Sequence, residues 1–195
     1  MKIALYLGSF NPFHNGHLEV VKTALNDYKM DKVVIVPAMQ NPWKKERVLD
    51  IDKRIEIISK YLNPWYQIRG IIPYEYAFEG DMNKRCIIDL IEKELIPPYY
   101  SYATLHALKN KYCNDKVFVL CGEDTIKDIP NWMNGEAIIQ DYDFLIVDRP
   151  KNSISSSSIR EMLRTRNKMD AYYSDEKLAK YVNPNVINLI KQYYD

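Results

Sequence analysis

The stretch that indicates the fold class of this chain is residues 3–18, IALYLGSFNPFHNGHL. The stretch opens with a short apolar run, residues 3–7, that ends at Gly8, a pattern typical of a strand buried on both faces. From Gly16 onward, apolar residues recur at helical spacing as far as Tyr28. A buried strand that turns within a few residues into a helix begins a βαβ unit, so this stretch predicts a parallel sheet.

The rest of the chain repeats this alternation of short apolar runs and helical spacing. Further strands are expected at residues 33–36, 67–72 (the weakest of them), 116–121 and 142–147. Further helices are expected at residues 52–62, around 85–95, and at 156–166, 175–181 and 184–194. We therefore predict an α/β fold, a Rossmann-like doubly wound parallel sheet with C-terminal helices, in a single domain over residues 1–195.

The composition excludes several classes of protein. Lys and Arg total 27 against 26 Asp and Glu, so no global positive charge is present to bind nucleic acid. Apolar residues make up 47% of the chain, yet no uncharged apolar stretch is long enough to cross a membrane. The N-terminal apolar run is too short for a signal peptide, and the three cysteines match no metal or redox spacing. These features predict a cytoplasmic protein that binds neither nucleic acid nor membrane.

The loop after the first strand carries the first candidate site. Two of the three histidines of the chain, His14 and His17, lie in it beside the start of the helix. Gly8 allows a ligand to approach the backbone closely, and a helix start offers N–H groups and the positive end of the helix dipole. Phosphate is the ligand that such a loop favours. The alternatives are histidines that only cap the helix, or a zinc site, for which no third ligand lies nearby in the sequence.

A second candidate site lies near the C-terminus, where residues 154–160 read Ile-Ser-Ser-Ser-Ser-Ile-Arg. Serines at a helix start are usually N-caps and nothing more. Arg160, about one turn into the same helix, adds a positive charge that favours a second anion site. In a doubly wound sheet, ligands bind beyond the carboxyl ends of the strands, and both candidate segments are expected at that edge.

Together the two segments, HxGH at residues 14–17 and ISSxxIR at residues 154–160, resemble the signature pair of nucleotidyltransferases that transfer adenylyl groups. Other stretches narrow the resemblance to the nicotinate and nicotinamide mononucleotide adenylyltransferases. These stretches are residues 37–45, 52–54, 100–105, 121–124 with 130–132, 148–150 and 181–186. The chain departs from that family at Ala103, where an acid is usual, in a longer stretch at residues 74–97, and in a shorter connection at residues 150–154.

The resemblance implies attack by the 5′-phosphate of a mononucleotide on the α-phosphate of ATP, which releases pyrophosphate, with Mg²⁺ bound along with ATP. The residues implied to be catalytic are His14, His17 and Arg160. Those implied to bind ATP are these three with Gly8, Ser9, Phe10, Gly122, Asp124, Ile154, Ser156 and Ser157. Those implied to contact the mononucleotide are Thr104, Trp132, which would stack on the pyridine ring, Arg149, and Lys44 or Lys45.

Several alternatives stay open on the sequence. The acceptor is expected to be nicotinate mononucleotide, with nicotinamide mononucleotide as the alternative. A phosphopantetheine acceptor is disfavoured by Trp132 and by residues 181–186, although Trp132 would otherwise be read as a core tryptophan. The short connection at residues 150–154 also allows a module that binds nucleotides without turnover. The sequence does not indicate an oligomeric state.

Overall fold

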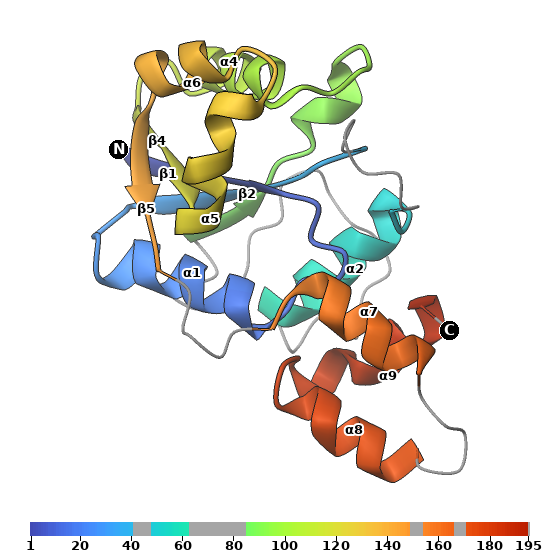
Figure 1. The fold of residues 1–195 in the computed structure, drawn as a ribbon. Coiled ribbons are helices and arrows are strands. Elements are labelled where there is room, and N and C mark those ends of the chain that lie inside the picture. The colour runs from blue at the N-terminus through green and yellow to red at the C-terminus, as the bar shows by residue number, and fades with distance from the viewer. Residues whose placement is uncertain (41–47, 63–84, 149–153, 166–170, 195) are drawn as a thin grey trace.

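The computed structural model describes residues 1–40, 48–62, 85–148, 154–165 and 171–194, with the backbone alone at 171–174. Its centre is a five-stranded parallel sheet in the order β3-β2-β1-β4-β5 (Figure 1). The strands are β1 (Lys2–Gly8), β2 (Lys32–Pro37), β3 (Cys86–Ile88), β4 (Lys116–Cys121) and β5 (Asp143–Ile146). The strand order reverses between β1 and β4, and the carboxyl ends of these two strands form the crevice where such sheets bind ligands. The predicted Rossmann-like fold is confirmed.

Helices cover both faces of the sheet (Figure 1). One face carries α1 (Asn15–Asn26) and α2 (Ile51–Leu62), and the other carries α4 (Ser101–Lys111), α5 (Glu123–Asp128) and α6 (Gly135–Asp141). The side chains of β1 alternate accordingly. Ala4 and Tyr6 belong to the core under α1 and α2, whereas Ile3 and Leu5 belong to the core under α4 and α6. None of the helices in the described ranges has the length and apolarity to cross a membrane.

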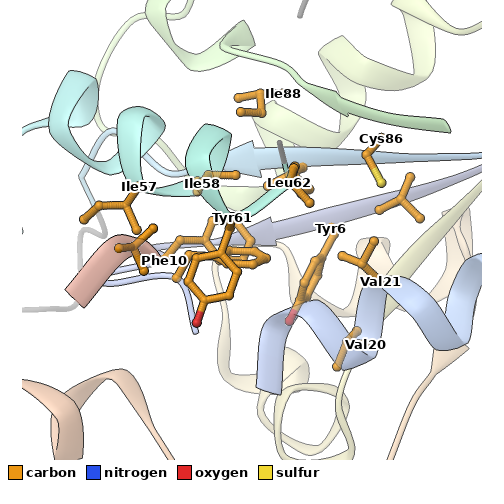
Figure 2. Close-up of a cluster of buried hydrophobic side chains, with 14 of the residues drawn as sticks. Tyr6, Phe10, Val20, Val21, Ile57, Ile58, Tyr61, Leu62, Cys86 and Ile88 are labelled. Atoms are coloured by element: carbon orange, nitrogen blue, oxygen red, sulfur yellow. The ribbon is translucent and has the colours of Figure 1, made fainter. Parts of the chain in front are cut away.

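The core between α1, α2 and the sheet is rich in aromatic rings (Figure 2). Tyr61 of α2 and Tyr6 of β1 both point into this layer, where they meet Val20 of α1 and Phe10 of the loop after β1. Burying a large apolar side chain of this kind stabilises the fold by about 1.5–3 kcal/mol. The packing therefore fixes the first turn of α1 against β1, and with it the loop that joins them.

The C-terminal helices are α7 (Ser156–Arg164), α8 (Ala171–Ala179) and α9 (Ile187–Tyr194), with a 3-10 turn, η5 (Pro184–Val186), before α9. They gather beside α2, away from β4 and β5 (Figure 1). Ile187 and Ile190 of α9 enter the same core as α2. The predicted C-terminal helices are thus confirmed, and they bring α7 close to the loop after β1.

The predicted helix at residues 85–95 is wrong. This stretch forms the short strand β3 and then a 3-10 helix, η2 (Ile91–Glu94). Cys86, Ile87 and Ile88 pair in register with β2, so partnership at the sheet edge outweighs the local helical spacing. The predicted strand at residues 67–72 and the short connection after Asp148 lie outside the described residues.

Candidate active site

The loop between β1 and α1 is built around a buried ring. Phe10 adopts a left-handed backbone conformation, with φ of 45°, and its side chain is only 2% exposed. A Cβ atom on Gly8 would lie 2.9 Å from Cζ of that ring. A larger residue at position 8 would therefore have to displace the buried Phe10 ring, which favours glycine in addition to the ligand approach that the sequence suggested.

His14 and His17 form a reciprocal cap at the start of α1. Nδ1 of His14 accepts a hydrogen bond from the backbone N–H of Gly16 at 3.1 Å, and Nδ1 of His17 accepts one from the backbone N–H of His14 at 3.2 Å. Both side chains are buried, and the ring centroids lie 3.8 Å apart. Because each Nδ1 accepts, the proton of each neutral ring is carried on Nε2. Capping of the helix therefore accounts for Nδ1 of each ring. It places the proton on Nε2, which is then a hydrogen-bond donor.

The serine segment bonds directly to this loop. Ser155 is the N-cap of α7 and accepts from the backbone N–H of Ser158. Ser156 Oγ donates to the carbonyl of Pro12 at 2.9 Å, and Arg160 Nη1 donates to the carbonyl of Asn11 at 2.7 Å. These contacts join residues 144 and 149 positions apart in the chain, and they bring the two candidate anion sites together.

The two segments line a pocket of about 310 Å³ at the carboxyl ends of β1 and β4. Its wall includes Ser9, His14 and His17 from one segment and Ser156 and Arg160 from the other. Hydroxyl, imidazole and guanidinium groups are hydrogen-bond donors, and no carboxylate lies among the described residues of this wall. The pocket therefore suits a polyanion such as a triphosphate.

A second pocket of about 480 Å³ adjoins the first. The two share Leu7, Gly8, Ser9, Ser101 and Trp132 in their walls, so they are neighbouring lobes of one cavity. Trp132 follows a 3-10 turn, η3 (Ile129–Asn131), and is half-buried, with part of its indole packed on the core under α4 and α6. Trp132 therefore packs on the core with part of its side chain and also lines both lobes of the cavity.

Comparison with known proteins decides the family. Residues 5–162 match the model of the cytidylyltransferase-like family. The chain is 31% identical to a probable nicotinate-nucleotide adenylyltransferase of Cytophaga hutchinsonii, over 98% of this chain and 87% of the relative. The chain belongs to the nicotinate-nucleotide adenylyltransferases. The nicotinate-nucleotide adenylyltransferase of Bacillus subtilis is 27% identical over 94% of this chain and 96% of the relative. The predicted family and enzyme class are confirmed.

Solved structures agree with this fold. A Plasmodium falciparum nicotinic acid mononucleotide adenylyltransferase complexed with NaAD superposes with a TM-score of 0.72, at 20% identity, over 100% of this chain and 97% of that one. The same enzyme complexed with APC gives a TM-score of 0.70. The chain thus shares the fold of these two structures over its whole length.

Most of the predicted site residues that the structure describes line the two-lobed cavity of this adenylyltransferase. They are Gly8, Ser9, Phe10, His14, His17, Gly122, Trp132, Ser156, Ser157 and Arg160. Asp124 is exposed on the first turn of α5, and its neighbour Thr125 lines the wall instead. Ile154 packs against the core. Lys44, Lys45 and Arg149 lie outside the described residues.

Thr104 is buried and is not among the described residues that line the cavity. It belongs to a polar network that the sequence did not predict. Its hydroxyl donates to Glu92 at 2.8 Å, and the other carboxylate oxygen of Glu92 accepts from the backbone N–H of Met39 at 2.7 Å. Burial raises the pKa of Glu92, against the opposing effect of these hydrogen bonds and of the Arg54 charge. Thr104 and Glu92 therefore brace the segment after β2.

Arg54 braces the same region from α2. Its side chain is 1% exposed, and it donates to the carbonyls of Leu49, Ser9 and Ala38 at 2.7–2.8 Å. Burial lowers the pKa of this guanidinium. The sequence could have indicated that Arg54 is buried, because this residue falls at helical spacing between Ile51 and Ile58, on the apolar face of α2.

Proposed function

We propose that this chain joins ATP to nicotinate mononucleotide in the two-lobed cavity and so forms deamido-NAD and pyrophosphate. An oxygen of the mononucleotide 5′-phosphate attacks the α-phosphorus of ATP, and the bond from that phosphorus to the bridging oxygen of the β-phosphate breaks. The observation that carries this proposal is the junction of the two anion-binding segments, where Ser156 and Arg160 bond to the carbonyls of Pro12 and Asn11. A second lobe bounded by Trp132 provides room for the acceptor.

The histidines act in this proposal as phosphate donors. The attacking oxygen is already anionic and the leaving group departs as an anion, so catalysis consists of positioning and charge stabilisation. Each ring offers Nε2–H to a phosphate oxygen while its Nδ1 holds the start of α1. A proton on Nδ1 would set two donors against each other, so the cap keeps each ring in the tautomer that a phosphate needs.

Arg160 and the serines serve the β- and γ-phosphates. Arg160 Nη2 also donates to Ser157 Oγ at 3.2 Å, which holds the guanidinium along the start of α7. A guanidinium held this way can meet two phosphate oxygens at once, and the first N–H groups of α7 add further donors. This end of the pocket is where pyrophosphate would leave.

We further propose that ATP is bound as its Mg²⁺ complex. Among the described residues, no group of three His, Cys, Asp or Glu side chains could hold a metal ion. The donor-rich wall instead suits an ion carried by the triphosphate oxygens, a mode that Mg²⁺ commonly adopts. Such an ion would neutralise charge that builds on the leaving pyrophosphate.

The second lobe would take the nicotinate mononucleotide. Tyr100 and Ser101, at the start of α4, line this lobe. Ala103 replaces the usual acid, so the first turn of α4 carries no acidic residue. Glu92 and Asp128 also line this lobe, so the choice of nicotinate rests on the relatives named as nicotinate-nucleotide adenylyltransferases and not on an acid-free wall.

Trp132→Ala is expected to raise KM for the mononucleotide roughly 5- to 30-fold, because it removes the aromatic face for a cationic pyridine ring. KM for ATP should stay within about twofold of the wild-type value, since His14, His17 and Arg160 line the first lobe and not the second. Steady-state kinetics with each substrate varied in turn measure both constants. Trp132→Phe, which keeps a smaller ring, should fall between; a change confined to ATP would contradict the stacking role.

Phosphorus labelling tests the reaction type. With ATP labelled at the α-phosphorus, the label should appear in the dinucleotide, and a label at the γ-phosphorus should appear in pyrophosphate. Release of ADP or of free inorganic phosphate as the first product would overturn the proposed adenylyl transfer.

A further inference from the structure

Asn11 is the residue at which the pocket wall meets the C-terminal helices. Its side chain is 5% exposed, and its Oδ1 accepts from the hydroxyl of Tyr194 at 2.6 Å and from the backbone N–H of Leu49 at 3.2 Å. Its own carbonyl accepts from Arg160 at 2.7 Å. The position of Arg160 therefore depends on how Asn11 is held.

The same C-terminal region also holds the far end of the loop. The backbone N–H of Asn15 donates to the carbonyl of Tyr181 at 2.9 Å. The hydroxyl of Tyr61 donates to Asn15 Oδ1 at 2.9 Å and accepts from the backbone N–H of Asn183 at 2.7 Å. The loop that carries His14 is thus tied to the C-terminal segment at both of its ends.

The hydroxyl of Tyr194 donates its hydrogen bond to Asn11 from a partly buried position, which suits it to hold the Asn11 side chain in place. Its ring packs against the core shared by α2 and α7. Burial raises the pKa of its hydroxyl, although the nearby Arg54 and Arg160 act in the opposite direction. The hydroxyl therefore stays protonated at neutral pH and donates a hydrogen bond to Asn11 Oδ1.

We propose that Tyr194 is a positioning residue for adenylyl transfer, which acts through Asn11 to set the phosphate loop and Arg160. The inference rests on the proposed function, because it assigns a purpose to the loop that Tyr194 holds. Tyr194 is not among the described residues of the cavity wall, so we place it as a positioning residue and not as a catalytic one. Its effect must pass through the 2.6 Å hydrogen bond to Asn11.

Tyr194→Phe is the direct test, because it removes one oxygen and keeps the ring in the core. We expect kcat to fall roughly three- to tenfold, the scale of one lost hydrogen bond, with KM for the mononucleotide unchanged. Tyr193→Phe is the matched control in the same helix, since that hydroxyl donates to Glu56 on α2 and does not contact the loop. Equal kcat values for the two variants would overturn the inference, as would a loss of kcat that follows a matching fall in Tm.

A double-mutant cycle tests whether the effect passes through Asn11. Adding Tyr194→Phe to Asn11→Ala should cause no further loss of kcat, because the acceptor is already absent. Additive losses would overturn the proposed route. If Asn11→Ala alone shows no measurable turnover, the comparison of Tyr194→Phe with Tyr193→Phe decides.

Amide hydrogen exchange provides a readout that does not need turnover. In Tyr194→Phe the backbone N–H of Leu49 and those of residues 8–17 other than Pro12 should exchange faster than in the wild type, whereas Tyr193→Phe should leave them unchanged. Unchanged protection in Tyr194→Phe would overturn the positioning role. A wild-type chain that shows this protection pattern but forms no dinucleotide would instead count against the proposed function alone.

Discussion

His17→Ala is expected to lower kcat by roughly 10²-fold or more, the loss typical of one donor aimed at developing negative charge. The ring lies 3.8 Å from that of His14 and lines the triphosphate lobe. KM for the mononucleotide should change little, because the second lobe keeps its walls. Steady-state pyrophosphate release measures both constants, and an alanine variant with unchanged kcat would remove His17 from the mechanism.

Two conservative variants separate the phosphate role of His17 from its capping role. His17→Asn places an oxygen near the position of Nδ1, so it keeps the acceptor for the His14 N–H and loses the distal donor. His17→Gln reaches further and keeps a donor near the position of Nε2. We expect the Gln variant to be the more active and the Asn variant the more stable. The reverse order of activity would show that the cap alone matters.

Arg54→Met is expected to lower the free energy of unfolding by about 3 kcal/mol, because it removes a buried side chain that donates to three partly buried carbonyl groups. Those carbonyls belong to Leu49, Ser9 and Ala38, which lie in three different segments around the cavity. Urea denaturation monitored by tryptophan fluorescence measures the change.

The matched control is Arg164→Met on α7. Arg164 is exposed, and it forms a surface ion pair with Glu161 at 3.8 Å. A surface pair of this kind contributes about 0–1 kcal/mol, so the midpoint of unfolding should hardly move. Equal effects of the two substitutions would contradict the bracing role of Arg54.

The parts of the fold that rest on strong periodicity were predictable from sequence. The uninterrupted apolar runs of β1, β2 and β4 mark strands buried on both faces, and motif spacing placed the histidine and serine segments at one edge. Strand β3 was not predictable, because three residues carry too little pattern to compete with helical spacing on either side. Its identity depends on pairing with β2, which local sequence does not display.

The residues of the candidate site that could be predicted are those whose role depends on their chemical type. Residues whose role depends on a tertiary contact could not be predicted as well. Histidines, serines and Arg160 are polar groups in a motif, so their meeting in one pocket could be expected. Thr104 was expected in the mononucleotide lobe, yet its hydroxyl bonds to Glu92, a partner 12 residues away that no motif marks. The contact of Tyr194 with Asn11 spans 183 residues and is visible only in the folded chain.

The specificity constant for the acceptor shows which mononucleotide this adenylyltransferase uses as its substrate. With saturating MgATP, kcat/KM should be measured for nicotinate mononucleotide, nicotinamide mononucleotide and 4′-phosphopantetheine in turn. We predict dinucleotide formation with nicotinate mononucleotide, at a kcat/KM at least about tenfold above that of nicotinamide mononucleotide, and no reaction with phosphopantetheine. The absence of any product with nicotinate mononucleotide, or a preference for either of the other acceptors, would contradict this prediction.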